Sequence, residues 1–249
     1  MKQLIRKLKK ITSLIPEKIY RNAIFHGVAA AIEHEEVLTK NFYTTIIDIG
    51  ANKGQFSLAV RKNFPEANIF AFDPLSNAAE TFKKVFINDK NTYFYNYAIG
   101  PNSGEELIHI SKKDDSSSLL SIGKLQTELF PGTEELKTSY IKISPLQDLI
   151  KKKNIVKPAL LKLDVQGFEY DALIGCESFL DMFDNIYCEC SYVELYVGQK
   201  LANDVEDLLK SFGFHLDSSY NISYDNKGNK IQADLLFKRE SIIENTNHL

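Results

Sequence analysis

Cysteine is scarce in this sequence. The chain has three cysteines, Cys176, Cys188 and Cys190, which is an odd number without the spacing to histidine that zinc sites use. This argues against a disulfide framework or a zinc site, and it predicts a reduced, cytoplasmic protein with no disulfide. Cys188 and Cys190 alternate along an apparent strand, so we expect both to face the same side as small, buried apolar residues.

Long apolar runs and a strong net charge are also missing. No apolar run approaches the length of a transmembrane helix, and the first residues lack the apolar core and cleavage site of a signal peptide. A formal net charge of −3 provides no field that would attract nucleic acid. The basic, amphipathic first ten residues leave two interpretations open, which are peripheral contact with an anionic membrane and a helix that packs on the domain.

The order of apolar and polar segments predicts one large α/β domain. Residues 1–40 are expected to form a cap of two helices, broken at Pro16, with the second helix running through GVAAAIEHEEVL. Residues 41–240 alternate strands with helices, which is typical of a mostly parallel sheet, and residues 241–249 form a tail. His26 and His34 lie in the cap without a partner pattern, so they are predicted to be structural or solvated.

An insertion is predicted at residues 101–144 of this domain. The segments ELIHIS and SYIKIS have the pattern of paired strands, and they bracket the serine-rich loop DDSSSLLSIG. Polar insertions between strands often carry substrate contacts, so this loop is a candidate substrate loop or lid.

The stretch TTIIDIGANKGQF, residues 44–56, has the pattern of a ligand-binding turn between a strand and a helix. A β-branched apolar run ends at Asp48, and Gly50 and Gly54 then allow the backbone to turn sharply close to a ligand. The first N–H groups of the following helix would face that ligand. We therefore predict that Asp48, Gly50, Asn52 and Gly54 contribute to a cofactor site, with Asp48 adding negative charge to the crevice.

The spacing of this loop distinguishes between two nucleotide cofactors. A dinucleotide fingerprint has the form G-x-G-x-x-G, whose middle glycine makes room for a pyrophosphate. Here Asn52 occupies that position, so the loop disfavours NAD. An acid beside the loop suits a cationic ligand, and S-adenosylmethionine, with its sulfonium and ammonium groups, fits that description.

The next two strands supply further candidate cofactor residues. Asp73 ends the strand NIFAFDP, 19 residues after Gly54, which is the offset at which an acid accepts hydrogen bonds from a ribose diol. Asp73 could equally cap the helix that follows Pro74, and one residue can do both. Asn96 and Ala98 fall at the carboxyl end of the predicted third strand, TYFYNYAIG, where an adenine edge would be recognised.

Several motifs together resemble the FkbM family of S-adenosylmethionine-dependent methyltransferases. They are IIDIGANKGQFS, FAFDP, NYAIG, LLKLDVQGFE and ECSYVELYVGQ, and the likeness extends from about residue 42 to residue 239. The resemblance implies a class I methyltransferase fold, a Rossmann-like, doubly wound sheet of seven strands in the order 3-2-1-4-5-7-6, with strand 7 antiparallel. It also implies O-methylation of a hydroxyl on a sugar, glycan or natural product. By position, Asp164, Gly167 and Glu169 match the family's second signature, in which many members have Glu where this chain has Gln166.

A sugar hydroxyl is a weak nucleophile, so a carboxylate near the acceptor is expected. Parallel α/β folds place their sites at the carboxyl ends of strands, where Asp164 and Glu189 are predicted to lie. Asp164 is the first candidate for the base or the acceptor-positioning group, and Glu189 is the second. A turn-stabilising role for Asp164 and a divalent ion bridging the two acids remain open, and no metal site is predicted.

Proteins of other classes remain possible. A non-catalytic S-adenosylmethionine-binding scaffold would keep the same loops, and an NAD-dependent oxidoreductase is the less favoured enzyme.

Overall fold

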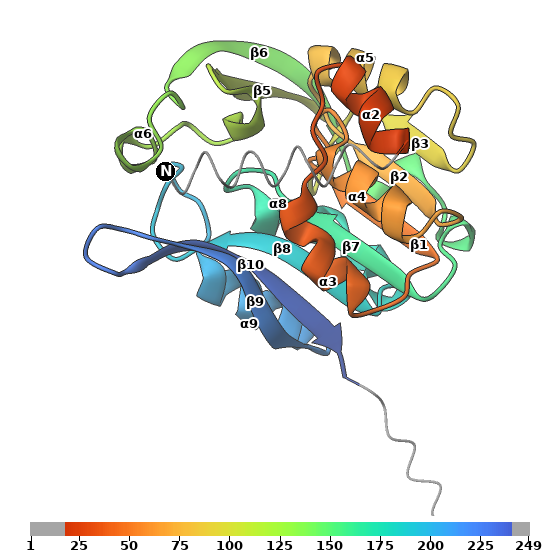
Figure 1. The fold of residues 1–249 in the computed structure, drawn as a ribbon. Coiled ribbons are helices and arrows are strands. Elements are labelled where there is room, and N and C mark those ends of the chain that lie inside the picture. The colour runs from red at the N-terminus through yellow and green to blue at the C-terminus, as the bar shows by residue number, and fades with distance from the viewer. Residues whose placement is uncertain (1–17, 241–249) are drawn as a thin grey trace, which may run out of the picture.

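Seven strands form the central sheet of the computed structural model, which describes residues 18–240 (Figure 1). The sheet has the order β3-β2-β1-β7-β8-β10-β9. The strands β1, β2, β3, β7 and β8 run parallel to one another, and β10 is antiparallel to both β8 and β9. This arrangement confirms the predicted strand order and the antiparallel last strand. The seven strands are β1 (Thr45–Ile49), β2 (Asn68–Phe72), β3 (Thr92–Tyr95), β7 (Ala159–Leu163), β8 (Asn185–Ser191), β9 (Phe214–Tyr224) and β10 (Lys230–Arg239).

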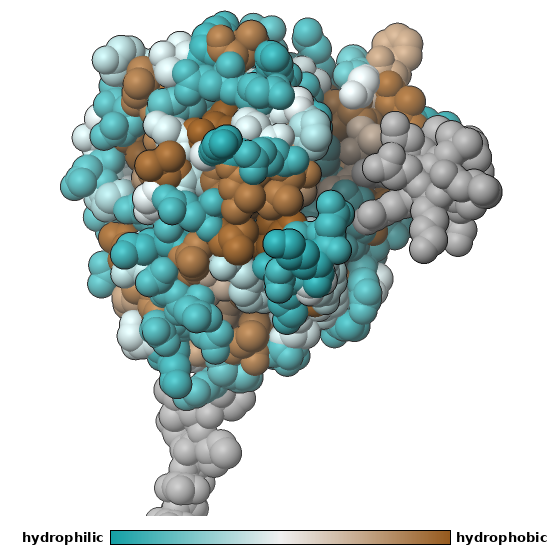
Figure 2. Space-filling view, turned by 90° about the vertical axis from the view of Figure 1, so that its left-hand side faces the viewer, coloured by the Kyte–Doolittle hydropathy of each residue, from teal (hydrophilic) through white to brown (hydrophobic). Residues whose placement is uncertain are grey.

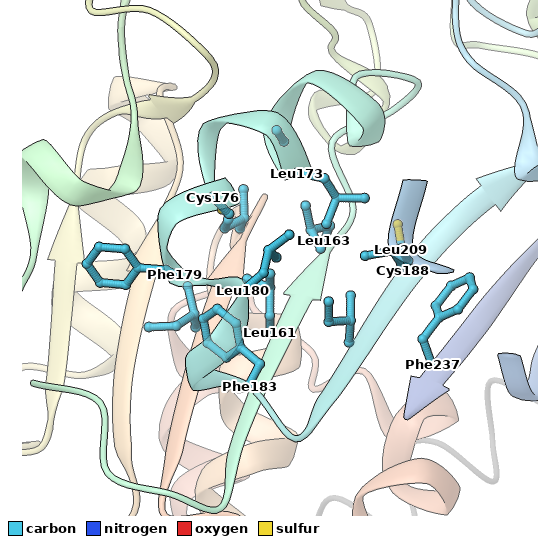
Figure 3. Close-up of a cluster of buried hydrophobic side chains, with 14 of the residues drawn as sticks. Leu161, Leu163, Leu173, Cys176, Phe179, Leu180, Phe183, Cys188, Leu209 and Phe237 are labelled. Atoms are coloured by element: carbon cyan, nitrogen blue, oxygen red, sulfur yellow. The ribbon is translucent and has the colours of Figure 1, made fainter. Parts of the chain in front are cut away.

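Helices cover both faces of this sheet, which explains its continuous apolar strands. One face carries α2 (Lys18–Phe25), α3 (Glu35–Thr39), α4 (Gln55–Asn63) and α5 (Ser76–Val85). The other carries α7 (Leu146–Leu149), α8 (Glu169–Gly175) and α9 (Ala202–Ser211). Figure 3 shows the core beneath α8 and α9, where Leu161 of β7, Leu173 of α8 and Phe237 of β10 belong to one buried cluster.

The N-terminal segment differs from its prediction. A 3₁₀ helix covers Ile32–His34 and continues into α3, but residues 27–31 are not helical. Gly27 has a φ of +73°, and residues of the non-helical segment from there to Ala31 line a cavity. The prediction of one helix through GVAAAIEHEEVL is therefore wrong in its first part. Pro16, the basic first ten residues and the tail 241–249 lie outside the described residues.

The insertion forms a second, three-stranded sheet of order β4-β6-β5 above the carboxyl ends of the main sheet. Its strands are β4 (Ala98–Ile99), β5 (Gly104–Ser111) and β6 (Glu135–Ser144), with α6 (Lys124–Leu129) between β5 and β6. The predicted pairing of ELIHIS with SYIKIS is confirmed as antiparallel. The prediction of a single third strand through TYFYNYAIG is wrong. The strand β3 ends at Tyr95, and Ala98–Ile99 pair with β6 in the small sheet.

The serine-rich loop packs against the segment that follows β8. Gly123 N donates to Leu195 O, Val197 N donates to Ser121 O, and the side chains of Leu195 and Tyr196 are buried in a small apolar cluster there. Figure 2 views the molecule from this side and shows hydrophobic residues gathered near the middle of the face, with polar residues around them. Among residues 18–240, no helix has the length and apolarity needed to cross a membrane.

Candidate active site

A cavity of about 460 Å³ lies at the carboxyl ends of β1, β2 and β7, which is a size typical of small-molecule sites. Of the predicted site residues, Gly50, Asn52, Asp73, Ala98 and Asp164 line it. The remaining four, Asp48, Gly54, Asn96 and Glu189, lie behind the wall or beside it. The N-terminal segment and the serine-rich loop close the cavity from the opposite side through residues that include Gly27, Ala31, Asp115 and Ser118.

The loop after β1 is shaped by a close approach of two backbones. Gly50 has a φ of +77°, and a Cβ at this position would lie 1.8 Å from the carbonyl oxygen of Asp164. Only glycine fits there. Asn52 also adopts a left-handed conformation, with a φ of +46°, and its N–H donates to Asp73 Oδ2 at 2.9 Å. The turn is thereby tied to the next strand.

Asp73 organises the junction between the first two strands. Its Oδ1 accepts from Leu75 N at 2.9 Å, so the carboxylate closes the turn before α5, whose N-cap is Leu75, while it holds the Asn52 turn. Burial raises the pKa of Asp73 to about 6, although the two backbone hydrogen bonds oppose that shift. Asn96 supports the same residue from behind, because its Nδ2 donates to the backbone oxygen of Asp73 at 2.8 Å.

Asp48 lies below the loop, and its charge is balanced within the protein. It is fully buried, accepts from Ser57 Oγ at 2.7 Å through Oδ2, and has Lys162 Nζ 3.2 Å from Oδ1. Asp48 therefore does not present a free negative charge to the crevice as the sequence suggested.

Lys162 is a site residue that the sequence reasoning missed. Its side chain is 5% exposed, lines the cavity, and donates to Gly50 O at 3.1 Å. Burial disfavours its charge, but Asp48 and Asp164 outweigh that effect and raise the pKa of Lys162 above its ordinary value. A lysine in the middle of the apolar strand LLKLD was the available signal, because a buried lysine requires an acidic partner.

Asp164 and Glu189 are joined by the amide of Gln166. Gln166 Nε2 donates to Asp164 Oδ1 at 2.7 Å and to Glu189 Oε2 at 2.8 Å, while its Oε1 accepts from Tyr196 Oη at 2.8 Å. Burial and the nearby Asp164 carboxylate raise the pKa of Glu189 well above its ordinary value. The structure therefore brings the two predicted acids together, and it gives Gln166 the role of separating their charges.

Glu169 holds the turn that carries this cluster. Its buried Oε1 accepts from Val165 N at 3.0 Å and from Gly167 N at 3.1 Å. Burial raises the pKa of Glu169 to about 7, against the effect of these hydrogen bonds. The residue orients the Asp164 turn from below rather than lining the cavity.

Two buried acceptors favour a ligand with several donors. Asn52 Oδ1 and Gln55 Oε1 belong to cavity-lining residues, and neither oxygen has a hydrogen-bond partner within residues 18–240. Such oxygens are costly unless a donor reaches them, and the hydroxyl and ammonium groups of S-adenosylmethionine are donors of this kind. The residues present therefore fit that cofactor. The same part of the chain contains no group of three His, Cys, Asp or Glu side chains placed to hold a metal ion.

Comparisons with known proteins relate this chain to methyltransferases. The model of the methyltransferase FkbM domain matches residues 48–216. The 2-O-methyltransferase NoeI of Sinorhizobium fredii is 28% identical over 178 residues, which cover 67% of this chain and 71% of the relative. Methyltransferase 1 of Beauveria bassiana is 23% identical over 194 residues, which cover 67% of this chain and 77% of the relative.

A likeness to solved structures extends over most of the chain. The precorrin-6y C5,15-methyltransferase of Geobacter metallireducens is 10% identical, with a TM-score of 0.49, over 86% of this chain and 92% of that one. The family match covers most of the central sheet and the Asp164 signature, and it implies S-adenosylmethionine as the methyl donor. This chain belongs to the FkbM family, and it is a methyltransferase.

Proposed function

We propose that the chain transfers a methyl group from S-adenosylmethionine to a hydroxyl oxygen of a sugar, glycan or related natural product. The observation that carries this proposal is the hydrogen-bonded cluster of Asp164, Gln166 and Glu189 beside the cofactor turn. The similarity to a relative named as a 2-O-methyltransferase supports oxygen as the acceptor atom.

The cofactor half of the cavity has a definite set of candidate contacts. Asn52 Oδ1, which has no partner within residues 18–240, would accept from the donor, and the carboxylate of Asp73 would accept from ribose hydroxyls. When bound, S-adenosylmethionine supplies an electrophilic methyl group. Ala98 lines the same cavity from the small sheet, where it would contact the adenine, and Asn96 keeps Asp73 in place from behind.

The acceptor half is suited to a neutral polyhydroxyl compound. The side chain of Asp164 is 35% exposed and lines the cavity, so it is the carboxylate that can accept a hydrogen bond from an acceptor hydroxyl. Glu189 lies behind it with a raised pKa, because burial and the Asp164 charge both disfavour its ionisation. An anionic acceptor would be repelled by Asp164, whereas a hydroxyl would be oriented by it. Orientation of this kind can supply about 7–11 kcal/mol of the acceleration.

The test uses tritium-labelled S-adenosylmethionine with separate pools of sugar nucleotides, oligosaccharides and lipid-linked glycans. We expect label in one of these pools as a methyl ether, which survives alkali, whereas a methyl ester does not. Alkali-labile label would contradict O-methylation of a hydroxyl. Cofactor binding without transfer to any pool would favour the non-catalytic scaffold.

The variant Asp164→Asn tests the role of that carboxylate, because asparagine keeps an oxygen for Gln166 while it removes the charge. Turnover should fall by about 10²–10⁴-fold with the dissociation constant of S-adenosylmethionine unchanged. Asp207→Asn, on the exposed side of α9, is the matched control. Full turnover by Asp164→Asn would remove Asp164 from the mechanism.

A further inference from the structure

His34 belongs to a hydrogen-bonded group that none of the preceding steps uses. Its Nδ1 lies 2.9 Å from Tyr187 Oη and 3.5 Å from Asp234 Oδ2. Tyr187 Oη donates to Asp234 Oδ2 at 3.1 Å, and Asn221 Nδ2 donates to the same oxygen at 2.8 Å. The imidazole is 15% exposed, and its edge contacts the ring of Phe56 at a centroid distance of 5.5 Å.

This network determines which ring nitrogen carries the proton. A tyrosine has one hydroxyl hydrogen, and Tyr187 gives it to Asp234. With the hydroxyl in that orientation, Nδ1 of His34 is assigned as the donor in its contact with Tyr187. In the neutral ring, Nε2 is then the nitrogen with a free lone pair, and it has no hydrogen-bond partner among residues 18–240.

His34 belongs both to this network and to the wall of the cavity. Nδ1 is held against β8 and β10, and His34 lines the same cavity as Lys162 and Asp164. His34 and Asp234 both fall outside residues 48–216, which the family model matches. The fold brings the two residues together from opposite ends of the described chain, and Asp234 is the register partner of Glu189.

We propose that His34 is the proton acceptor for the acceptor hydroxyl, with Tyr187 and Asp234 as its positioning residues. This inference rests on the proposed O-methyl transfer. The hydroxyl proton moves to His34 Nε2 as the oxygen bonds to the methyl carbon, and the methyl–sulfur bond breaks with its electron pair left on sulfur. One positive charge leaves the donor and one appears on the imidazole.

The surroundings of His34 are suited to that new charge. The Asp234 carboxylate faces Nδ1 from β10, so it would stabilise the imidazolium in the way that a buried aspartate orients a catalytic histidine. Tyr187 faces the ring from β8, and Phe56 covers it from α4. Lys162 Nζ lies 5.5 Å from the centroid of the same Phe56 ring.

The first test separates proton transfer from cofactor binding. His34→Gln should lower the single-turnover rate of methyl transfer into the glycan and sugar-nucleotide pools by about 10²–10⁴-fold. The dissociation constants of S-adenosylmethionine and S-adenosylhomocysteine, measured by calorimetry, should stay within about twofold of wild type. His215→Gln, on an exposed position of β9, is the matched control. An unchanged rate, or a loss of cofactor affinity as large as the loss of rate, would overturn the proposal.

The second test needs no acceptor. Nitrogen-15 NMR of the imidazole rings in the unliganded protein should show His34 protonated at Nδ1 and with a lone pair at Nε2, the signals being assigned by their absence from His34→Gln. Asp234→Asn should shift this tautomer without changing cofactor affinity, which a merely structural residue would not do. A proton on Nε2 in the wild-type protein would refute the assignment even if no pool is methylated. Absence of alkali-stable label with wild-type protein would instead refute the proposed function.

Discussion

Replacement of Lys162 by methionine removes the cation that balances Asp48. The two side chains are 5% and 0% exposed, and Lys162 Nζ lies 3.2 Å from Asp48 Oδ1. At an effective dielectric constant of about 20, this separation corresponds to roughly 5 kcal/mol of attraction. Breaking a buried pair by removing one partner typically costs about 3–5 kcal/mol, because the remaining charge is buried without compensation. We therefore expect Lys162→Met to lower the free energy of unfolding by about 4 kcal/mol.

Urea unfolding at pH 7, followed by circular dichroism, measures this loss, and the midpoint of thermal unfolding should fall by about 10 °C. The double variant Asp48→Asn/Lys162→Met removes both charges, and asparagine can still accept from Ser57. It should regain at least about 2 kcal/mol relative to Lys162→Met alone. Lys238→Met is the control, because its pair with Asp217 is 37% and 31% exposed and should contribute at most about 1 kcal/mol.

Two results would refute this reasoning. One is a Lys162→Met protein within about 1 kcal/mol of wild type, which would mean that Asp48 does not need its cation. The other is a double variant as unstable as the single one, which would mean that the packing of the lysine stem, and not its charge, carries the effect.

Three further variants test the loops around the cavity. Asp73→Ala should weaken S-adenosylmethionine binding about 10- to 100-fold by calorimetry, because the Asn52 turn loses a charged acceptor; unchanged affinity would contradict its assignment. For Glu169, a folded-state pKa near 7 against an ordinary 4.5 means that wild-type stability falls as pH rises from about 4.5 to 7. The stability of Glu169→Gln lacks this pH dependence. Its unfolding free energy should therefore exceed that of wild type by a margin that grows by about 3 kcal/mol from pH 4 to pH 8 in urea titrations. A margin that stays constant with pH would refute the raised pKa of Glu169. Gly50→Ala should abolish cofactor binding, because its Cβ would clash with Asp164. Gly228 has a similar φ of +85° but no atom within 4 Å of an added Cβ, so Gly228→Ala should cost only about 1 kcal/mol of stability. If the two variants lost the same stability, backbone strain rather than the Asp164 clash would matter at Gly50.

Local patterns were sufficient to predict the sheet and the position of its cavity. The strands β1, β2 and β7 are apolar runs that end at an acid or a glycine turn, as in the run ending at Asp48 and the one ending at Asp164. Because parallel strands end at one edge, the residues after them meet there regardless of how distant they are in sequence. Gly50, Asn52, Asp73 and Asp164 were identified in this way, and all four line the cavity.

The pairing of side chains across that edge was decided by tertiary structure. Asp48 looked like a cofactor residue, but its register partner in β7 is Lys162, and the two neutralise each other below the loop. His34 had no partner pattern in its own segment, because its partner Asp234 lies near the other end of the described chain. The end of β3 at Tyr95 likewise depends on a distant strand, because Ala98–Ile99 pair with β6 in the small sheet.

The amino-acid sequence by itself therefore determined which residues reach the edge of the sheet, because the period of apolar residues and the placement of glycine are local properties of the chain. Which charges meet, which cancel and which remain available in the cavity was determined only by the register between distant strands. A shift of one residue in that register would turn each of these side chains to the opposite face, and no local pattern specifies it.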